Sequence, residues 1–457
     1  MTISKDIFRA YDIRGIVENA LTPDAVQQIG QAFATEALSQ GQKTVVIGRD
    51  GRLSSPELAK RLSEGLCAGG CDVIDVGMVP TPVLYYATHK LETGTGIMVT
   101  GSHNPPKYNG LKMLIAGNTL YGDGITALYN MIIEGRLSSG DGKHTEQDIL
   151  PDYLDTIVSD IKLEKPLDIA VDCGNGVAGV CAVELFTRLG CNVTELFCDV
   201  DGNFPNHHPD PSKPENLLDL QNAMKENDLD LGLAFDGDGD RVGILDDKQN
   251  ILWADRQMML YSADVLKRKP GAQIIFDIKS TSNLKAYIEN LGGEPLMWKT
   301  GHSFIKAKMK ETGAELAGEM SGHIFFKERW FGFDDGLYGA ARMLEIVSQF
   351  DEPSSVIFER LPDSVNTPEL QVNFEEGEHY KFMDTFIAQS SFEGADTVTI
   401  DGIRVNYPNG WGLIRPSNTT PCLVLRFEAN DEETLKDIQN TFREKMLAVN
   451  NSLNLPF

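Results

Sequence analysis

Positive charge is scarce in this sequence. The 457 residues include 41 Lys and Arg against 67 Asp and Glu, which gives a formal net charge of −26. A field of that sign repels phosphate backbones and anionic bilayers, so the composition argues against nucleic acid or a membrane surface as a partner. If the ligand is itself an anion, the basic residues must be gathered locally. Each Arg or Lys in a Gly-rich loop is therefore informative.

Long apolar runs and paired cysteines are also missing. No stretch approaches the roughly 20 apolar residues of a membrane-spanning helix, and the N-terminus, Met1 to Arg9, has no apolar signal core. The seven cysteines are an odd number and form no C-x-x-C pair, which argues against a disulfide framework and against a zinc site. We therefore expect a cytoplasmic protein with reduced thiols.

A unit of strand, helix and strand recurs three times along the chain, over residues 44–77, 167–197 and 273–298. Each copy is followed by one more apolar run that ends in an unusual loop. These runs and loops cover residues 96–106, 229–241 and 314–323. Ligands of open α/β sheets sit beyond the carboxyl ends of the strands, so three loops at equivalent places predict one shared cleft.

The last hundred residues have a different pattern. A Pro-bearing stretch at 361–368 is typical of a linker, short alternating runs follow it, and a terminal helix is expected near Asp431. We predict three successive α/β domains with mixed sheets and a smaller C-terminal α+β domain, arranged around a central cleft. The predicted limits are 1–147, 148–251, 252–363 and 364–457.

The first loop, T-G-S-H-N-P-P, places Ser102 at the end of a predicted strand, beside His103 and ten positions before Lys112. A serine in this setting is a candidate nucleophile once a base or a strong electrophile lowers its barrier. The alternative is an ordinary Gly/Asn/Pro turn.

The second loop, D-G-D-G-D-R, contains Asp236, Asp238 and Asp240 at alternate positions, followed by Arg241. Three converging carboxylates repel one another unless a hard cation lies among them, and oxygen ligands suit Mg²⁺. An EF-hand would need a Glu near the twelfth position and an entering helix, whereas the preceding residues form a strand pattern. Arg241 is placed to hold a phosphoryl oxygen beside the metal. The alternative is a solvated acidic turn.

Two further loops offer ligands for a sugar phosphate. G-E-M-S-G-H presents Glu319 and Ser321, a carboxylate and a hydroxyl that suit vicinal sugar hydroxyls. R-P-S-N-T-T-P, which starts at Arg415, presents a guanidinium, hydroxyls and backbone N–H groups, as in sites that hold a non-reacting phosphate. A buried turn and a plain β-turn are the alternatives. His302 in K-T-G-H and Arg14 in F-R-A-Y-D-I-R-G are weaker candidates, with a structural histidine and a surface ion pair as alternatives.

These four motifs, in this order, resemble the α-D-phosphohexomutase family over essentially the whole chain. G-E-M-S-G-H and R-P-S-N-T-T are similar to its phosphomannomutase/phosphoglucomutase branch. The phosphoglucosamine branch usually has G-E-Q-S-G-H and R-x-S-G-T-E instead, so Met320 and Asn418 bear on the choice of substrate.

The resemblance implies an enzyme that interconverts hexose 1-phosphate and 6-phosphate, of mannose, glucose or both, through a phosphoserine at Ser102 and a hexose 1,6-bisphosphate. Ser102 and the three Asp residues would hold Mg²⁺, while Arg241 offsets the charge of the moving group. Candidates for proton and charge management are Arg14, His103 and Lys112. The substrate-binding residues that it implies are Tyr11, Lys279, His302, Glu319, Ser321, His323, Arg415, Ser417, Asn418 and Thr419.

Three other functions remain open on the sequence. One is a Mg²⁺-dependent serine phosphomonoesterase, in which water takes the phosphoryl group; another is a non-catalytic sugar-phosphate sensor. The third, within the family, is a phosphoglucosamine mutase. In each case the partners are small-molecule hexose phosphates, and we expect a monomer or a weak homo-oligomer.

Overall fold

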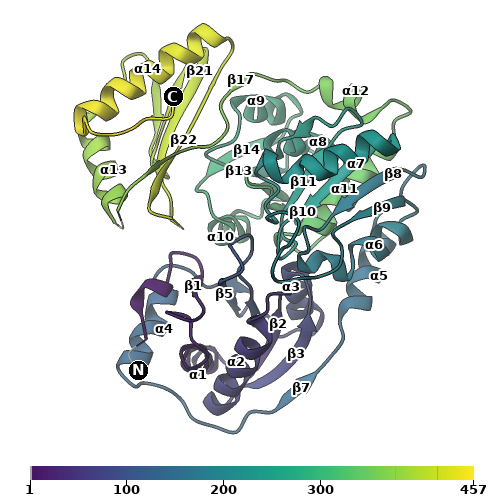
Figure 1. The fold of residues 1–457 in the computed structure, drawn as a ribbon, viewed down its shortest axis with the longest axis vertical. Helices are drawn as coiled ribbons and strands as arrows, with labels where there is room; N and C mark the ends of the chain where they lie inside the picture. Colours follow the sequence, from purple (N-terminus) through teal and green to yellow (C-terminus); the bar gives the residue numbers. More distant parts are fainter. Residues whose placement is uncertain (1–2, 376, 419) are drawn as a thin grey trace.

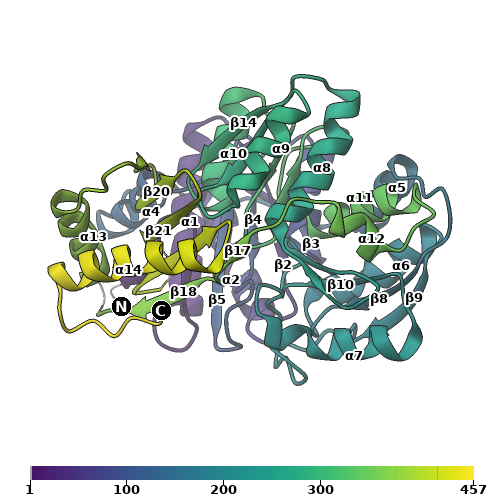
Figure 2. The same cartoon turned by 90° about the horizontal axis from the view of Figure 1, so that it is seen from above.

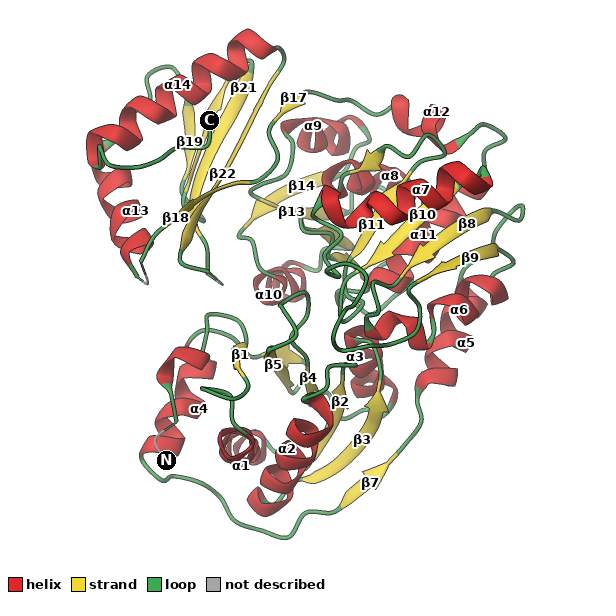
Figure 3. Cartoon of the chain, viewed as in Figure 1, coloured by secondary structure: helices red, strands yellow, loops and turns green. Residues whose placement is uncertain are grey.

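The computed structural model describes residues 3–375, 377–418 and 420–457. Four β-sheets follow one another along a curved path, from the first at the bottom of Figure 1 to the C-terminal sheet at its upper left. In Figure 3 helices flank each of the sheets. The predicted fold class, three α/β domains and a smaller C-terminal domain, is confirmed.

The first three sheets are built on one plan, and their strands have the following bounds. The first contains β1 (Ile13–Ile16), β2 (Thr44–Arg49), β3 (Asp72–Met78), β4 (Gly96–Val99), β5 (Tyr108–Ile115), β6 (Asn118–Thr119) and β7 (His144–Glu146). The second contains β8 (Asp168–Asp172), β9 (Asn192–Leu196), β10 (Leu231–Phe235), β11 (Val242–Leu245) and β12 (Ile251–Leu252). The third contains β13 (Gln273–Asp277), β14 (Glu294–Trp298), β15 (Leu316–Gly318) and β16 (Ile324–Phe326).

The shared plan explains why the candidate loops converge. The strand orders β5-β4-β2-β3, β11-β10-β8-β9 and β16-β15-β13-β14 are equivalent. In each sheet the first strand of the unit is parallel to the second and third, and a fourth pairs antiparallel with the third. The same hairpin connection therefore occurs in three copies, each at the carboxyl end of the third strand. These copies are the serine loop (residues 100–107), the triple-Asp loop (236–241) and the Glu-Ser loop (319–323).

Helices cover these sheets. They are α1 (Pro23–Ser39), α2 (Ser55–Gly69), α3 (Thr81–Lys90), α4 (Asp123–Ile133), α5 (Leu150–Asp160), α6 (Ala182–Arg188), α7 (Leu218–Asn227), α8 (Ala254–Arg268), α9 (Ser282–Asn290), α10 (His302–Thr312), α11 (Gly336–Ser348) and α12 (Ser354–Glu359). Across the described parts of the chain, none of the helices has both the length and the apolar character needed to cross a bilayer.

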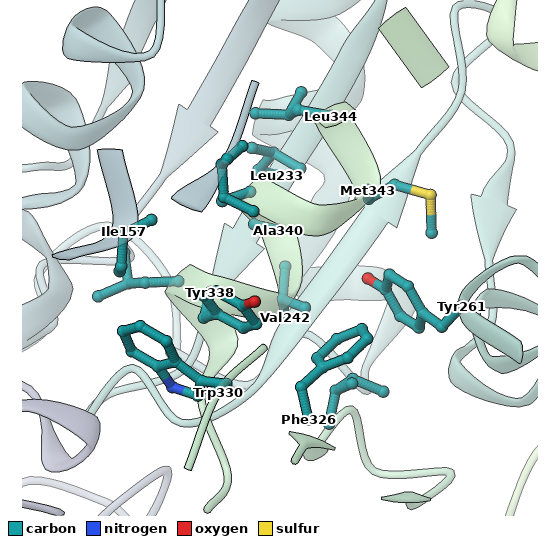
Figure 4. Close-up of a cluster of buried hydrophobic side chains, with 14 of the residues drawn as sticks. Ile157, Leu233, Val242, Tyr261, Phe326, Trp330, Tyr338, Ala340, Met343 and Leu344 are labelled. Atoms are coloured by element: carbon teal, nitrogen blue, oxygen red, sulfur yellow. The ribbon is translucent and has the colours of Figure 1, made fainter. Parts of the chain in front are cut away.

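Helix α11 joins the second and third sheets into one core. All its residues are buried, because it packs against α8 and β16 on one side and β10 and β11 on the other. Figure 4 shows Tyr338 and Leu344 of this helix among side chains from both sheets. Its first residue, Gly336, lies so close to the triple-Asp loop that a Cβ there would come within 2.7 Å of the Arg241 carbonyl oxygen. The same helix that unites the core thus supports that loop.

The C-terminal sheet is antiparallel, with two helices on it (Figures 1 and 2). Its elements are β17 (Val365–Asn366), β18 (Leu370–Asn373), α13 (Glu378–Gln389), β19 (Asp396–Val398), β20 (Ile403–Tyr407), β21 (Gly410–Pro416), β22 (Cys422–Ala429) and α14 (Glu432–Val449). Strand β17 lies inside the stretch predicted as a linker and pairs with β22. That prediction was only partly right, because a strand of two residues shows no alternation in the sequence.

Candidate active site

A cavity of about 230 Å³ lies where the three hairpin loops face the C-terminal sheet. Of the predicted site residues, those that line it are Tyr11, Arg14, Ser102, His103, Lys112, Arg241, Lys279, His302, Glu319, Ser321, His323, Arg415 and Ser417. Lys213 lines it as well, so Lys and Arg from several loops gather here although the chain carries a net charge of −26. The cavity is therefore suited to an anionic ligand.

Ser102 lies at the bottom of this cavity in a strained backbone conformation. Its φ is +47°, a left-handed value that few side-chain-bearing residues adopt, and its backbone N–H donates to Thr100 Oγ1 at 2.8 Å. The hydroxyl donates to Asp236 Oδ2 at 3.1 Å and lies 3.1 Å from His103 Nδ1. The residue is only 1% exposed, because the triple-Asp loop packs over it at Gly237.

Arg52 holds the serine loop in place and was missed by the sequence analysis. This buried guanidinium donates to the carbonyl oxygens of Ser102 (2.7 Å), Asn104 (2.5 Å), Pro105 (2.8 Å) and Tyr108 (3.0 Å). It also pairs with Asp50 at 3.1 Å and lies over the ring of Phe204 from the second α/β unit. The turn G-R-D-G-R was visible in the sequence, but nothing there indicated a contact with a loop fifty residues away.

Asp236, Asp238 and Asp240 converge as predicted. All three are fully buried, and one carboxylate oxygen of each lies within 4.8 Å of the others. Gly237 lets this loop lie directly against the serine loop, since a Cβ there would come within 2.4 Å of the Ser102 carbonyl oxygen. Lys112 Nζ donates to Asp238 at 2.7 Å and to Asp240.

This group fits a divalent metal ion. Burial, and after it the negative charges of Asp240 and Asp238, raises the pKa of Asp236 well above its usual value, so a bound cation would offset both effects. Asp238 Oδ1 is buried without a hydrogen-bond partner among the described residues. An all-oxygen ligand set with an orphaned carboxylate oxygen suits Mg²⁺. A second group, Asp240, His323 and Asp334, also lies within this distance but includes a nitrogen ligand, which Mg²⁺ favours less.

The two basic groups beside Ser102 have opposite charge states. Burial opposes the charged form of Lys112, but Asp238 and Asp240 outweigh it and raise the pKa of the ammonium, so it stays a cation. Burial, and then the charge of Arg241, lowers the pKa of His103 well below its usual value, so its imidazole is neutral. Lys112 can therefore offset negative charge, and His103 can accept a proton. Arg14 reaches the same loop, donating to Asn104 Oδ1 at 2.7 Å.

The Glu-Ser loop is connected to the triple-Asp loop through His323. Its Nδ1 lies 3.1 Å from Glu319 Oε2 and 3.0 Å from Ser321 Oγ, while Nε2 lies 3.3 Å from Asp240 Oδ1. Burial disfavours the protonated ring, but the Asp240 carboxylate outweighs it and raises the pKa of His323 to about 9. Glu319 also accepts from the Gly301 N–H at 2.5 Å, so loops at 301 and 319 meet.

His302, at the start of α10, stacks on His323 with ring centroids 5.6 Å apart. Its Nδ1 lies 3.2 Å from Lys306 Nζ, which donates to Asp334 at 2.7 Å. Burial, and then the Lys306 ammonium, lowers the pKa of His302 well below its usual value. The ring of Tyr11 meets His302 edge-on at 6.1 Å.

The far end of the cavity belongs to the C-terminal sheet. Arg415 on β21 is 4% exposed and uses Nε to bond Asp401 at 2.9 Å. Burial opposes its charge, but Asp401 raises the pKa of the guanidinium. Its Nη2 is buried without a partner among the described residues. An unsatisfied guanidinium N–H on the cavity wall indicates a site for an anion.

The neighbours of Arg415 divide into those at the cavity and those outside it. Ser417 lines the cavity, and its Oγ lies 3.1 Å from Thr420 Oγ1. Asn418 is not among the lining residues; its side-chain oxygen accepts from Tyr380. Thr419 lies outside the described residues. Met320, expected to influence substrate choice, packs against Arg426 Nη1 at 3.2 Å and does not line the cavity.

Lys279 faces Arg415 from the third sheet. Its ammonium donates to Glu369 at 2.5 Å. Burial would raise the pKa of this carboxyl, but Lys279 outweighs that effect and lowers it to about 2. Glu369 and Thr420 were both missed. Glu369 stands in no Gly-rich or charged motif, and Thr420 belongs to R-P-S-N-T-T-P, in which only the residues up to Thr419 were assigned. The threonine directly follows the predicted residues of the Arg loop.

Known proteins show the same organisation. Models of the phosphoglucomutase/phosphomannomutase α/β/α domains I, II and III match residues 5–136, 151–249 and 253–365, and the model of the C-terminal domain matches 369–445. A phosphomannomutase/phosphoglucomutase of Pseudomonas aeruginosa is 55% identical over 456 residues, which cover 100% of this chain and 98% of the relative. A phosphoglucomutase of Neisseria gonorrhoeae is 54% identical over 446 residues, 97% of each chain.

A solved structure agrees along the whole chain. The crystal structure of a phosphoglucomutase/phosphomannomutase family protein from Burkholderia thailandensis superimposes with a TM-score of 0.94, covers 100% of both chains and is 52% identical. The order of the four loops, the repeated hairpin and these matches lead to the same conclusion. The chain belongs to the phosphoglucomutase/phosphomannomutase family, as its motifs predicted.

Proposed function

We propose that this protein is a phosphohexomutase that converts hexose 1-phosphate to hexose 6-phosphate, and the reverse, with mannose and glucose as sugars. The observation that carries the proposal is the presence of two phosphate-handling groups in one cavity. Ser102, bonded to Asp236, lies at one end, and Arg415, whose Nη2 has no partner in the described part of the chain, lies at the other. A hydrolase needs only the first, whereas a mutase must hold one phosphate while it transfers the other.

Ser102 is the proposed phosphoryl carrier, with Asp236, Asp238 and Asp240 as the Mg²⁺ ligands. The metal would supply positive charge for the phosphoryl oxygens. Lys112 and Arg241 add fixed positive charge beside the serine oxygen, and Arg52 keeps the loop from moving as the charge changes. Arg14 lies on the same loop through Asn104.

In the first step the sugar O6 attacks the phosphorus of phosphoserine 102. The bond from phosphorus to O6 forms, the bond to the serine oxygen breaks, and a proton leaves O6. Neutral His103, at 3.1 Å from the serine oxygen, is a candidate to accept this proton and pass it to the departing serine oxygen, which leaves Ser102 as a neutral hydroxyl. The resulting hexose 1,6-bisphosphate then reverses its orientation in the cavity. Its 1-phosphate is transferred to Ser102, which leaves hexose 6-phosphate.

Glu319 and Ser321 are the proposed ligands of sugar hydroxyls that both orientations can present, most simply O3 and O4. His323 orients them from behind through its Nδ1. Tyr11, Lys279 and His302 complete the wall, and Arg415 with Ser417 holds the phosphate that is not reacting. Asn418 and Thr419 would join them once substrate is bound.

Substrate capture also requires motion between units. We propose the units 1–147, 148–252, 253–363 and 364–457, with the second limit one residue later than the sequence predicted because β12 includes Leu252. Residues 361–364 and 367–368, on either side of β17, are the proposed hinge.

The test is a panel of mannose, glucose and glucosamine 1-phosphates, with and without glucose 1,6-bisphosphate, while inorganic phosphate is measured in parallel. A mutase forms the 6-phosphates, responds to the bisphosphate and releases little phosphate. One phosphate released per turnover would instead identify a phosphomonoesterase, and binding without turnover a sensor. A strong preference for glucosamine 1-phosphate would identify a phosphoglucosamine mutase.

A further inference from the structure

A second cavity, of about 750 Å³, lies behind the active cavity between the first and third sheets. The hairpin of β5 and β6 and helix α3 form one wall; α10 and the loop after β16 form the other. No residue of this cavity lines the active cavity. We call it the aromatic cavity, and it is large enough for a ligand of nucleotide size.

Aromatic faces are exposed at this cavity. Phe331 is 42% exposed and Tyr121 37% exposed, which makes them two of the few large apolar side chains on the surface. Phe331 stacks parallel to Phe333, with centroids 6.0 Å apart and planes within 2°, and His89 lies 5.1 Å from it. Burial lowers the pKa of His89, so the group adds a further neutral ring. Such a surface suits a planar ring that stacks on it.

Two lysines at the same cavity have no acidic partner. Lys310 Nζ donates to Asn118 Oδ1 at 2.7 Å, and Lys327 Nζ donates to the Gly313 carbonyl oxygen at 3.2 Å. Over the part of the chain that the structure describes, no carboxylate forms an ion pair with either ammonium. The acidic residue at this cavity, Glu311, is engaged by Lys308 at 2.7 Å. In a chain of net charge −26, this is a local site for an anion.

The aromatic cavity is connected to the active cavity through one side chain. Lys306 lines the aromatic cavity with its ammonium 4.1 Å from the centroid of the Tyr85 ring. The same ammonium lies 3.2 Å from His302 Nδ1 and donates to Asp334. A ligand that moves Lys306 or α10 therefore changes the position of a histidine on the wall of the active cavity.

From these observations we infer that the aromatic cavity is a binding site for a nucleoside phosphate. Its base stacks on Phe331, and its phosphate groups lie between Lys310 and Lys327. Because the two walls come from different sheets, the ligand joins the first and third units and alters turnover through Lys306 and His302. The binding site does not rest on the proposed function, since binding is measured without any reaction, whereas the effect on turnover rests on it.

Calorimetric titration with ADP, GDP and UDP tests the site. Inorganic pyrophosphate probes the phosphate-binding lysines alone, and the free nucleosides probe the aromatic surface alone. We expect saturable binding of the nucleotides, and binding at least about tenfold weaker for pyrophosphate and for nucleosides, because each lacks one half of the recognition. The variants Phe331→Ala and Lys310→Gln/Lys327→Gln each weaken nucleotide binding by about tenfold or more. The control Lys267→Gln/Lys436→Gln removes the same charge from exposed positions elsewhere and binds as wild type.

The active cavity is the competing location, and Arg415→Ala separates the two. The inference predicts that this variant still binds nucleotide, and that nucleotide changes kcat of the wild type but not of Lys310→Gln/Lys327→Gln. It is overturned if no nucleotide binds at millimolar concentration. It is also overturned if binding survives in Lys310→Gln/Lys327→Gln but is lost in Arg415→Ala.

Discussion

The two ends of the active cavity are held in opposite ways. At the serine end, Ser102 and the three Asp residues are no more than 1% exposed, and Arg52 fixes the loop through four carbonyl oxygens. At the other end, Arg415 keeps one buried N–H without a partner among the described residues. The serine end must hold reacting atoms in line, whereas the Arg415 end must bind a phosphate, release it and bind its counterpart. The fixed backbone of the serine loop and the unused guanidinium donor of Arg415 thus match two different tasks.

The largest expected effect comes from a substitution at the serine end of the cavity. Ser102→Ala removes the proposed phosphoryl carrier, so kcat should fall by about 10⁴-fold or more. The fraction of protein heavier by one phosphoryl group should disappear from the peptide 100–112 by mass spectrometry. Stability should fall by roughly 1 to 3 kcal/mol, because buried hydrogen bonds to Asp236 and His103 are lost, so the variant should still fold. Ser159→Ala, remote and exposed, is the control, and full activity of Ser102→Ala would refute the mechanism.

Loss of the Arg415 guanidinium at the other end should weaken the binding of substrate and still allow phosphorylation of Ser102. Arg415→Ala should raise KM for glucose 1-phosphate by about 100-fold, because a buried charged donor to phosphate is lost. Arg415→Lys should recover only part, since an ammonium lacks the planar fork. Small-angle scattering should show a smaller radius of gyration with a non-reacting sugar phosphate in the wild type, and a weaker effect in Arg415→Ala. Arg443→Ala, on α14 of the same domain, serves as the control.

A further prediction concerns the proposed metal ligands at the serine end of the cavity. Chelation should abolish turnover and Mg²⁺ should restore it. Asp238→Asn should raise the Mg²⁺ concentration for half-maximal activity by about 10- to 100-fold, with little change in KM for the sugar phosphate. Asp384→Asn, on the surface of the C-terminal domain, should behave as wild type. An unchanged Mg²⁺ requirement in Asp238→Asn would mean that the loop is structural.

Between the two ends, Glu319 should act on the sugar alone. Glu319→Ala should lower kcat/KM for glucose and mannose 1-phosphates by similar factors, roughly 10- to 100-fold, the effect of one charged hydrogen bond of about 1.5 to 3 kcal/mol. Steady-state kinetics with both epimers decides the point. A loss confined to one epimer would show that the configuration at C2 is read by this carboxylate.

The smallest effect concerns the rigidity of the serine end. Arg52→Lys keeps the charge opposite Asp50 but removes most of the four bonds to the loop, so kcat should fall by about tenfold while KM stays within about twofold. Equal losses at kcat and KM, or wild-type kinetics, would show that the loop keeps its position without Arg52.

The architecture and most residues of the candidate site could be predicted from the amino-acid sequence alone. The repeat could be recognised because each copy shows local periodicity. Asp236 was found because its loop concentrates carboxylates and glycines, and Arg415 because its loop combines a guanidinium with several hydroxyl-bearing residues. The equivalence of the three loops followed from their common place after the third strand of each copy.

The contacts that support those loops could be seen only in the folded chain. The contact between Arg52 and the serine loop, the pairing of Lys279 with Glu369, and the burial of Ser102 under Gly237 all join residues that are remote in the chain. The same holds for α11, which unites two sheets, and for the aromatic cavity between the first and third sheets. Local patterns record which face of an element is apolar, but long-range packing decides which side chains meet across the chain.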